Sequence, residues 1–304
     1  MKNNYYFESF DGKKIYVHEW AVDNPVGVVQ VVHGMAEHGG RYAPLAQYLN
    51  EQGYFVFADD HRAHGKTDEK TLGYCGGNIW EDTLKDIKLL NEHYKKKFPD
   101  KKYMIIGHSY GSFLMQAYIS KFDGIKGNLF DAVVLSGSAK MDGLDIKLGK
   151  IIASLGKGNS PARLIKKMSF DAYNKKFKEG IFVSSLPDEC ERYISDPFCN
   201  FVCSKNFYKN FFSGLTKLYK QEALDKLNRD LPMLIISGEQ DPVGDYKKSV
   251  TRLYQTYLRQ GVKNIELITY PNNRHEVLND ISKKEAYQAI SDFLSSVSVK
   301  QQTA

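Results

Sequence analysis

The sequence lacks the features of a secreted, disulfide-bonded or membrane-embedded protein. It contains only four cysteines in 304 residues, which is too few for a disulfide scaffold. No run of about 18 apolar residues occurs, and the amino terminus, MKNNYYFESFDGKKI, has no apolar stretch of signal-peptide length. Internal repeats and low-complexity tracts are also missing. We therefore expect a cytoplasmic protein without a membrane-spanning segment.

The composition also gives little support for a metal centre or for nucleic-acid binding. Cys199 and Cys203 could lie one helical turn apart, but a structural zinc site needs four close nitrogen or sulfur ligands. The formal net charge is +6, and no segment resembles a nucleic-acid-binding motif. The hydrophobic fraction of 42% is enough for a sizeable core. We expect no metal and no cofactor, and the oligomeric state is left open.

Apolar segments alternate with amphipathic segments along most of the chain, which predicts strands alternating with helices. The segments YYFESF and KKIYVHEW flank Asp11-Gly12, a pair typical of a hairpin turn. Further strands are predicted at 26–32, 54–59, 102–107, 131–137, 232–238 and 264–270, and helices at 41–53, 80–98, 112–122, 245–260 and 284–297. This order predicts an α/β fold with a mostly parallel eight-stranded sheet, helices on both faces and the hairpin as an antiparallel edge.

One strand-to-helix junction carries a serine between two glycines. Gly107-His108-Ser109-Tyr110-Gly111 fits G-x-S-x-G, the nucleophile elbow of α/β-hydrolases, where a strained turn presents the serine hydroxyl. The pattern alone occurs by chance, but here an apolar strand precedes it and a helical pattern follows, as the elbow requires. Ser109 is therefore the predicted nucleophile.

A serine nucleophile needs a base, and in this fold the acid and the histidine follow it in chain order. Asp241 and His275 each come just after a predicted strand, and His275 is the only histidine after the candidate acid. Asp245 and Glu239 are rival acids. We predict that His275 takes the proton of Ser109 and that Asp241 orients the imidazole and stabilises its cation.

An oxyanion hole is predicted from two backbone amides. One belongs to Tyr110, the residue after the nucleophile, and the other to Met35, in the loop VVHGMAEHGGRY after a predicted strand. Glu37 and His38 are expected to brace this loop. His108 is expected to pack into the elbow rather than to act as a base.

Five segments together resemble the bacterial monoglyceride lipase/lysophospholipase family of α/β-hydrolases. They are HGMAEHGGRYAPLAQYL, ADDHRAHGKTD, GHSYGS, SGEQDPVGD and NNRHEVLND, in this order. The resemblance implies a cap inserted between the sixth and seventh strands and hydrolysis of a carboxylic ester with one acyl chain. Ala63 departs from the family pattern, which usually has glycine there, and this should matter little unless the backbone needs a positive φ.

The loop HRAHG allows two interpretations. His61 and His64 are three residues apart and could share a metal. We favour a structural role, in which Asp60, His61 and Arg62 anchor the loop beside the floor of the active site.

The strand–helix alternation stops between Gly137 and Pro232, which predicts a helical cap over 140–228 and a core of 1–139 and 229–304. The predicted cap has 16 Lys and Arg against 10 Asp and Glu, whereas the remainder has 26 of each. Helical spacing places Phe207 and Phe211 on one face, where they could line an acyl pocket, with Phe212 one residue further round. The basic surface of the predicted cap could contact anionic lipid. Alternatively, the aromatic side chains pack on the core and the lysines are simply solvated.

The predicted function is hydrolysis of monoacylglycerol-like or lysophospholipid-like esters through an acyl-enzyme on Ser109. A small-ester carboxylesterase, an acyltransferase and a peptidase are alternatives on the same scaffold. A non-catalytic binding protein of this fold is a further alternative, which the complete set Ser109, Asp241 and His275 disfavours.

Overall fold

In the computed structural model, the described residues, 2–122 and 129–299, contain an eight-stranded sheet with the order β1-β2-β4-β3-β5-β6-β7-β8. Residues 1, 123–128 and 300–304, which the predicted core segments include, lie outside the described residues. The strands are β1 (Lys2–Glu8), β2 (Lys14–Trp20), β3 (Gly27–Val32), β4 (Tyr54–Asp59), β5 (Lys102–His108), β6 (Ala132–Ser136), β7 (Met233–Gly238) and β8 (Ile265–Tyr270).

The strand pairing confirms the predicted fold. β1 and β2 form the antiparallel hairpin, and β2 pairs antiparallel with β4. The remaining neighbours, from β4 through β3 and β5 to β8, pair in parallel. The parallel strands place their carboxyl ends at one edge of the sheet, where ligands bind in folds of this class.

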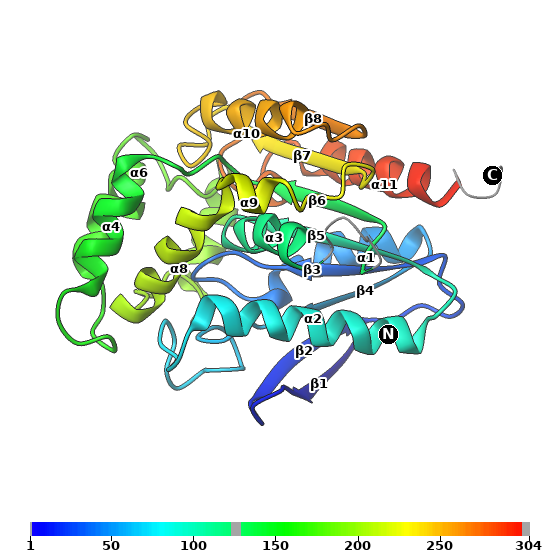
Figure 1. The fold of residues 1–304 in the computed structure, drawn as a ribbon, viewed down its shortest axis with the longest axis horizontal. Coiled ribbons are helices and arrows are strands. Elements are labelled where there is room, and N and C mark those ends of the chain that lie inside the picture. Colours follow the sequence, from blue (N-terminus) through cyan, green and yellow to red (C-terminus); the bar gives the residue numbers. More distant parts are fainter. Residues whose placement is uncertain (1, 123–128, 300–304) are drawn as a thin grey trace.

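Helices cover both faces of the sheet (Figure 1). Leu45 of α1 (Ala43–Glu51) shares a buried cluster with Val29, whereas Leu84 of α2 (Ile79–Lys97) shares another with Val28. Neighbouring residues of a strand point to opposite faces, so β3 is apolar at almost every position. The helices are η1 (Gly39–Tyr42), α1 (Ala43–Glu51), α2 (Ile79–Lys97), α3 (Tyr110–Lys121), α4 (Leu144–Ser154), α5 (Arg163–Met168), α6 (Phe170–Asn174), α7 (Pro187–Ser195), α8 (Lys205–Leu218), α9 (Gln221–Leu224), α10 (Lys248–Arg259), η2 (Val277–Asn279) and α11 (Lys283–Val299).

The chain between β6 and β7 forms α4 to α9. Figure 1 shows α4 and α8 beyond the carboxyl ends of β6 and β7, with α4 on the outer side of α8. The two helices pack closely against each other, and α8 also contacts α2 and α3. Across the described segments, none of the helices has the length and apolar character needed to span a bilayer.

The start of α10 differs from the prediction. The sequence pattern placed the helix from about Asp245, but it begins at Lys248. Asp245, Tyr246 and Lys247 have φ values of 49°, 49° and 81°, which lie in the left-handed region and cannot continue a right-handed helix. This turn lies directly after the loop that carries Asp241.

Candidate active site

Ser109 lies in a sharp turn between β5 and α3. Its φ is 50°, and its amide donates to the carbonyl of Ser136 at 2.9 Å. Both positions flanking the elbow must be glycine, because neighbouring backbone atoms lie too close to leave room for a side chain. A Cβ on Gly107 would lie 2.7 Å from the carbonyl oxygen of Gly111, and one on Gly111 would lie 2.1 Å from that of Val32. The elbow therefore packs against β3, and the hydroxyl of Ser109 faces the carboxyl edge of the sheet.

The structure brings Ser109, His275 and Asp241 into one hydrogen-bonded chain. His275 Nε2 lies 2.8 Å from Ser109 Oγ, and His275 Nδ1 lies 2.9 Å from Asp241 Oδ2. The other oxygen of Asp241 accepts the amide of Val243 at 2.8 Å. Burial acts to lower the pKa of His275, but the charge and hydrogen bond of Asp241 outweigh it, so this pKa lies above its ordinary value. The arrangement suits a general base that becomes a cation during the reaction.

The rival residues lie elsewhere. Glu239 accepts hydrogen bonds from Lys247 at 2.8 Å and Thr269 at 2.9 Å, and Asp245 is exposed. His108 is buried beside the elbow, with its Nδ1 3.3 Å from Ser136 Oγ. Burial lowers the pKa of His108 to about 3. Among these histidines and carboxylates, only His275 and Asp241 form the chain to the nucleophile.

The loop after β3 presents the amide of Met35 to the site. The amides on either side of it are already used, since Gly34 donates to Glu37 Oε1 at 2.6 Å and Ala36 to His64 Nε2 at 3.2 Å. Within the described ranges, no hydrogen bond engages the amides of Met35 or Tyr110. Both residues line the cavity beside Ser109, where two amide donors could stabilise an oxyanion.

Glu37 belongs to a buried network that sequence reasoning only partly found. Arg41 donates to Glu37 Oε2 at 2.7 Å and to both oxygens of Glu276 at 2.7 Å. The carboxylates outweigh the effect of burial and hold the pKa of Arg41 above its ordinary value. The network links the loop of Met35 to the residue that follows His275. The position of Glu276 next to the predicted base was the only signal for it in the sequence.

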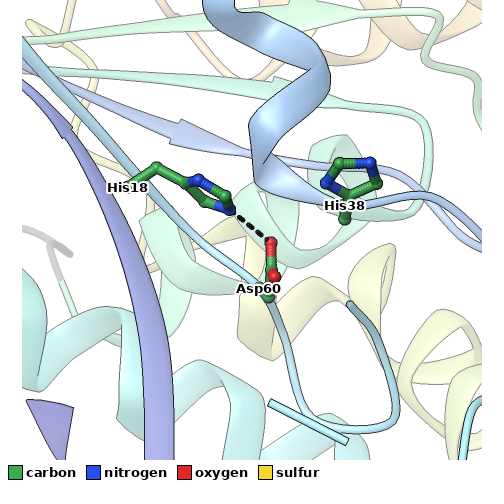
Figure 2. Close-up of side chains that lie close together, drawn as sticks. All are labelled: His18, His38 and Asp60. Carbon is green, nitrogen blue, oxygen red and sulfur yellow. Dashed lines mark hydrogen bonds and ion pairs between the residues drawn. The ribbon is translucent and has the colours of Figure 1, made fainter. Parts of the chain in front are cut away.

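A group of polar side chains, His18, His38 and Asp60, lies at the start of η1 (Figure 2). One ligand atom from each lies within 4.8 Å of the others, a spacing that could suit a metal ion. However, Asp60 Oδ1 is hydrogen-bonded to His18 Nε2 and to the amide of Gly39, both at 2.9 Å. His38 Nδ1 accepts the amide of Gly40 at 3.2 Å. The amides of Gly39 and Gly40 and the His18–Asp60 contact already engage these atoms, and His38 Nε2 lies 3.0 Å from Asp196 Oδ2, so we assign the group to anchoring the loop that leads into η1.

His61 and His64 also serve the loops around them. His61 Nδ1 lies 2.6 Å from Asp59 Oδ2, and His64 Nδ1 lies 2.9 Å from the carbonyl of Arg62. Burial lowers the pKa of His64 to about 3, so its Nε2 is free to accept the amide of Ala36. The ring centroids of the two histidines are 6.3 Å apart. His61 Nδ1 and both nitrogens of His64 bind these different partners, and neither histidine belongs to a group of three possible metal ligands among the described residues, so a shared metal site is not supported.

The same loop contains the departure from the family pattern. Arg62 anchors the loop through Asp86 and Asp11, each at 2.6 Å. Ala63, the next residue, is fully buried and has a φ of 68°. The backbone therefore does need the conformation that favours glycine, and alanine there carries strain on the order of 1 kcal/mol.

A cavity of about 220 Å³ adjoins Ser109 beneath the helices that follow β6. Most of its lining is apolar, and the charged residues that line it are Glu37, Asp145 and Glu276. Among the described residues, no Lys or Arg lines it. Its apolar lining includes Met35, Phe113, Met141, Ile146, Leu148, Ile152, Ile165, Met168, Phe170, Phe182, Val183, Phe211, Phe212 and Val243.

The prediction for α8 needs a correction. Phe211 lines the cavity, but Phe207 does not. Phe207 is buried against the elbow, with its ring centroid 5.0 Å from that of Tyr110 and 5.6 Å from that of His64. Phe212, which the helical pattern placed further round, lines the cavity and stacks on Tyr208. The cavity therefore faces the side of α8 that carries Phe211, Phe212 and Tyr208.

Comparisons with known proteins find similarity over most of the chain. The family model Hydrolase_4, described as serine aminopeptidase, S33, matches residues 23–282. The chain is 27% identical to a monoacylglycerol lipase of Mycolicibacterium smegmatis over 289 residues, 93% of each chain. It is 25% identical to a monoglyceride lipase homolog of Monkeypox virus over 280 residues, 91% of each. A thermostable carboxyl esterase from Bacillus coagulans, solved in complex with glycerol, has a TM-score of 0.88 and 28% identity, and the match covers 98% of this chain and 99% of that one.

Proposed function

The chain belongs to the Hydrolase_4 family (serine aminopeptidase, S33) and is a serine hydrolase of the monoglyceride lipase and esterase type, and from this premise we propose that it hydrolyses monoacylglycerol-like lipid esters. The observation that carries the proposal is the apolar cavity beside Ser109, whose charged lining groups are carboxylates. We further propose that residues 140–228 form a cap over this cavity and that 1–139 and 229–304 form the catalytic core.

The proposed reaction uses the hydrogen-bonded chain described above. Ser109 Oγ attacks the ester carbonyl carbon while His275 Nε2 takes its proton, and the amides of Met35 and Tyr110 stabilise the oxyanion. The tetrahedral intermediate then expels the alcohol, which receives the proton from His275, and leaves an acyl group on Ser109. A water molecule, deprotonated by His275, hydrolyses the acyl-enzyme and releases the fatty acid. Asp241 stabilises the imidazolium in both steps.

The polar side of the cavity favours a neutral alcohol over a phosphate. Glu37 and Glu276 are shared by a single cation, Arg41, which leaves the pair with a net negative charge. Carboxylates accept hydrogen bonds from hydroxyl groups and repel a phosphodiester. The glycerol bound to the similar carboxyl esterase is consistent with a glycerol leaving group here. These features favour monoacylglycerol over lysophospholipid.

A substrate panel tests the proposal. Burial of each added methylene should contribute about 0.8 kcal/mol, so kcat/KM for monoacylglycerols should rise by up to about fourfold per methylene from acetyl and then level off where the cavity ends. At equal acyl length, lysophosphatidylcholine should be the poorer substrate. An optimum at acetyl would instead indicate a small-ester carboxylesterase, and preferred cleavage of amino-acyl nitroanilides would indicate a peptidase.

The variant Phe211→Ala should flatten this rise with acyl length while it spares acetyl esters, because the chain of Ser109, His275 and Asp241 is untouched. The structure predicts the same for Phe212→Ala, since Phe212 also lines the cavity. The measurement is kcat/KM across a p-nitrophenyl ester series. Phe293→Ala, on α11 in the cluster of the opposite sheet face, is the matched control and should keep the wild-type slope.

We propose that the outer face of the cap docks on anionic lipid. Exposed apolar side chains gather on and around α4, where Leu144 is 80%, Ile151 60% and Leu155 62% exposed. Lys147 and Lys150 lie on the same helix, and basic side chains near an anionic surface attract it by about 1 kcal/mol each. Figure 1 shows α4 at the edge of the molecule, away from the sheet.

This face leads into the active site. Leu148 of α4 and Met168 of α5 are both more than half exposed and also line the cavity. A lipid surface in contact with α4 would therefore lie next to the entrance through which an acyl chain must pass. The patch has the mixture of apolar and basic side chains that interfacial helices use.

The variant Ile151→Glu should weaken binding to anionic vesicles by about tenfold, because it places a charged side chain in the contact and opposes the lipid charge. Turnover of vesicle-borne monoacylglycerol should fall with it, and turnover of soluble p-nitrophenyl butyrate should not. Co-sedimentation with vesicles measures binding. Leu258→Glu on α10, an exposed leucine outside the cap, is the control. Equal binding of wild type and Ile151→Glu would refute the docking face.

A further inference from the structure

The segment 179–185, which we call the strap, lies between α6 and α7 and runs beside the loop of His275. The amide of His275 donates to the carbonyl of Phe182 at 3.2 Å, and the amide of Glu276 donates to the carbonyl of Val183 at 2.8 Å. The ring of Phe182 lies 5.4 Å from the imidazole, between centroids. The backbone of the predicted base is thus paired with the inserted segment rather than with the core sheet.

Arg274, the residue before His275, binds the strap with its side chain. Its guanidinium lies 4.1 Å from the centroid of the Phe177 ring, just before the strap. The two hydrogens of Nη1 are shared among three strap carbonyls, those of Glu179 at 3.1 Å, Ile181 at 2.8 Å and Ser184 at 2.9 Å. The guanidinium therefore contacts the ring of Phe177 and the three carbonyls at the same time. Arg274 therefore defines the path of the strap around His275.

Asp280 binds the carboxyl-terminal end of the strap, at Ser185. Its side chain is fully buried, and its Oδ2 accepts the amide of Arg274 at 2.7 Å. Its Oδ1 accepts the amide and the hydroxyl of Ser185, at 3.0 and 2.5 Å, and the amide of Ile281 at 2.9 Å. The hydroxyl of Ser184 lies 3.2 Å from the same oxygen and 2.9 Å from the carbonyl oxygen of Asn279. One carboxylate thus holds both the strap and the residue before His275. All these partners are N–H or O–H donors, so both side-chain oxygens of Asp280 must act as hydrogen-bond acceptors.

We propose that Arg274 and Asp280 are positioning residues that hold His275 against Ser109 through the strap. The strap is then a fixed part of the catalytic apparatus, and any movement of the cap that admits a substrate occurs outside it. A displacement of a catalytic group by about 1 Å can lower a rate by about 100-fold, so such positioning is consequential. The proposal rests on the catalytic role of His275 in the proposed function.

The variant Asp280→Asn tests it most directly. The carboxamide must place its NH₂ group against an N–H or O–H donor, which opposes the present contacts while keeping the size of the side chain. We expect kcat for p-nitrophenyl butyrate to fall by about 10- to 100-fold with KM nearly unchanged. The rate at which a fluorophosphonate labels Ser109 should fall by the same factor, because it depends on the same base.

Arg274 offers a graded test. Arg274→Met should give a similar fall in kcat, and Arg274→Lys should restore part of it, because an ammonium can still donate to the carbonyls of the strap. Hydrogen exchange at the amides of His275 and Glu276 should be faster in Arg274→Met, since both amides are bonded to strap carbonyls. A residue with a purely structural role would lower stability without this selective change in kcat.

Matched controls come from α7. Arg192→Met and Asp188→Asn change exposed residues of the same types outside the strap and should leave kcat unchanged. If Asp280→Asn does not fold, Ser185→Ala removes only one of the bonds to Asp280 and should lower kcat by a smaller factor, again at unchanged KM. Folded variants with wild-type labelling rates, or with KM raised as much as kcat is lowered, would overturn the proposal. A wild type that is not labelled would instead refute the catalytic role of Ser109 and His275.

Discussion

Ser109→Ala and His275→Ala should each lower kcat by about 10⁵- to 10⁶-fold, with little change in KM. Ser109 Oγ lies 2.8 Å from His275 Nε2, so the hydroxyl is activated only when both groups are present. Because the groups act as a unit, the double variant should be no worse than either single variant. Steady-state turnover of a p-nitrophenyl ester, normalised to folded protein, is the measurement.

The control for this experiment is His93→Gln, which removes an exposed histidine of α2 outside the site and should keep wild-type turnover. Fluorophosphonate labelling of the wild type, absent in Ser109→Ala, would exclude the alternative of a non-catalytic binding protein. The assignment of the nucleophile fails if Ser109→Ala retains more than a few per cent of activity.

The core of the fold and the three hydrogen-bonded residues Ser109, His275 and Asp241 could be predicted because their sequence signals are local. A strand buried on both faces is apolar at most positions, and β3, β5 and β7 all show this in the sequence. Ser109 is flanked by glycines, which are needed because neighbouring backbone atoms leave no room for a side chain at these positions. Asp241 and His275 follow strands in the order that this fold uses, and parallel strands bring such positions to one edge.

The lining of the cavity could not be predicted in the same way. The spacing of the aromatic residues in α8 correctly indicates a helix and which residues share a face. It does not indicate how the helix is rotated against the core, and that rotation places Phe207 on Tyr110 and leaves Phe212 at the cavity. Rotation depends on the shapes of all packed neighbours, such as Trp80, which lies against Gly214 of α8. Amphipathic spacing alone cannot supply this information.

The supporting contacts around His275 were also beyond sequence reasoning. Arg41 and Glu276 are separated by 235 positions, and Ser185 and Asp280 by 95. Each of these residues is ordinary in its own segment, and only the folded chain makes them partners. Ala63 shows a related difficulty, since its departure from the family pattern is visible in the sequence but its φ of 68° is not. Conformation and long-range pairing are decided by the whole structure.

Asp241→Asn should lower kcat by about 10³- to 10⁴-fold while the protein stays folded. Asp241 Oδ2 accepts the proton on His275 Nδ1, and a carboxamide at that position favours the imidazole tautomer with its proton on Nε2, which cannot act as the base. Asp245→Asn and Glu239→Gln should cost far less, because neither side chain contacts the imidazole. A larger loss in Asp245→Asn than in Asp241→Asn would assign the acid to Asp245.

The pH profile of Asp241→Asn gives an independent measure of the same contact. His275 must be neutral to accept a proton, so activity is lost as the pH falls through its pKa. In the wild type Asp241 raises this pKa against the effect of burial, so the acid limb of kcat/KM should lie above the ordinary histidine value of about 6.5. Without the carboxylate the lowering by burial prevails, and the acid limb should move to lower pH. An unchanged acid limb would mean that the charge of Asp241 does not act on His275.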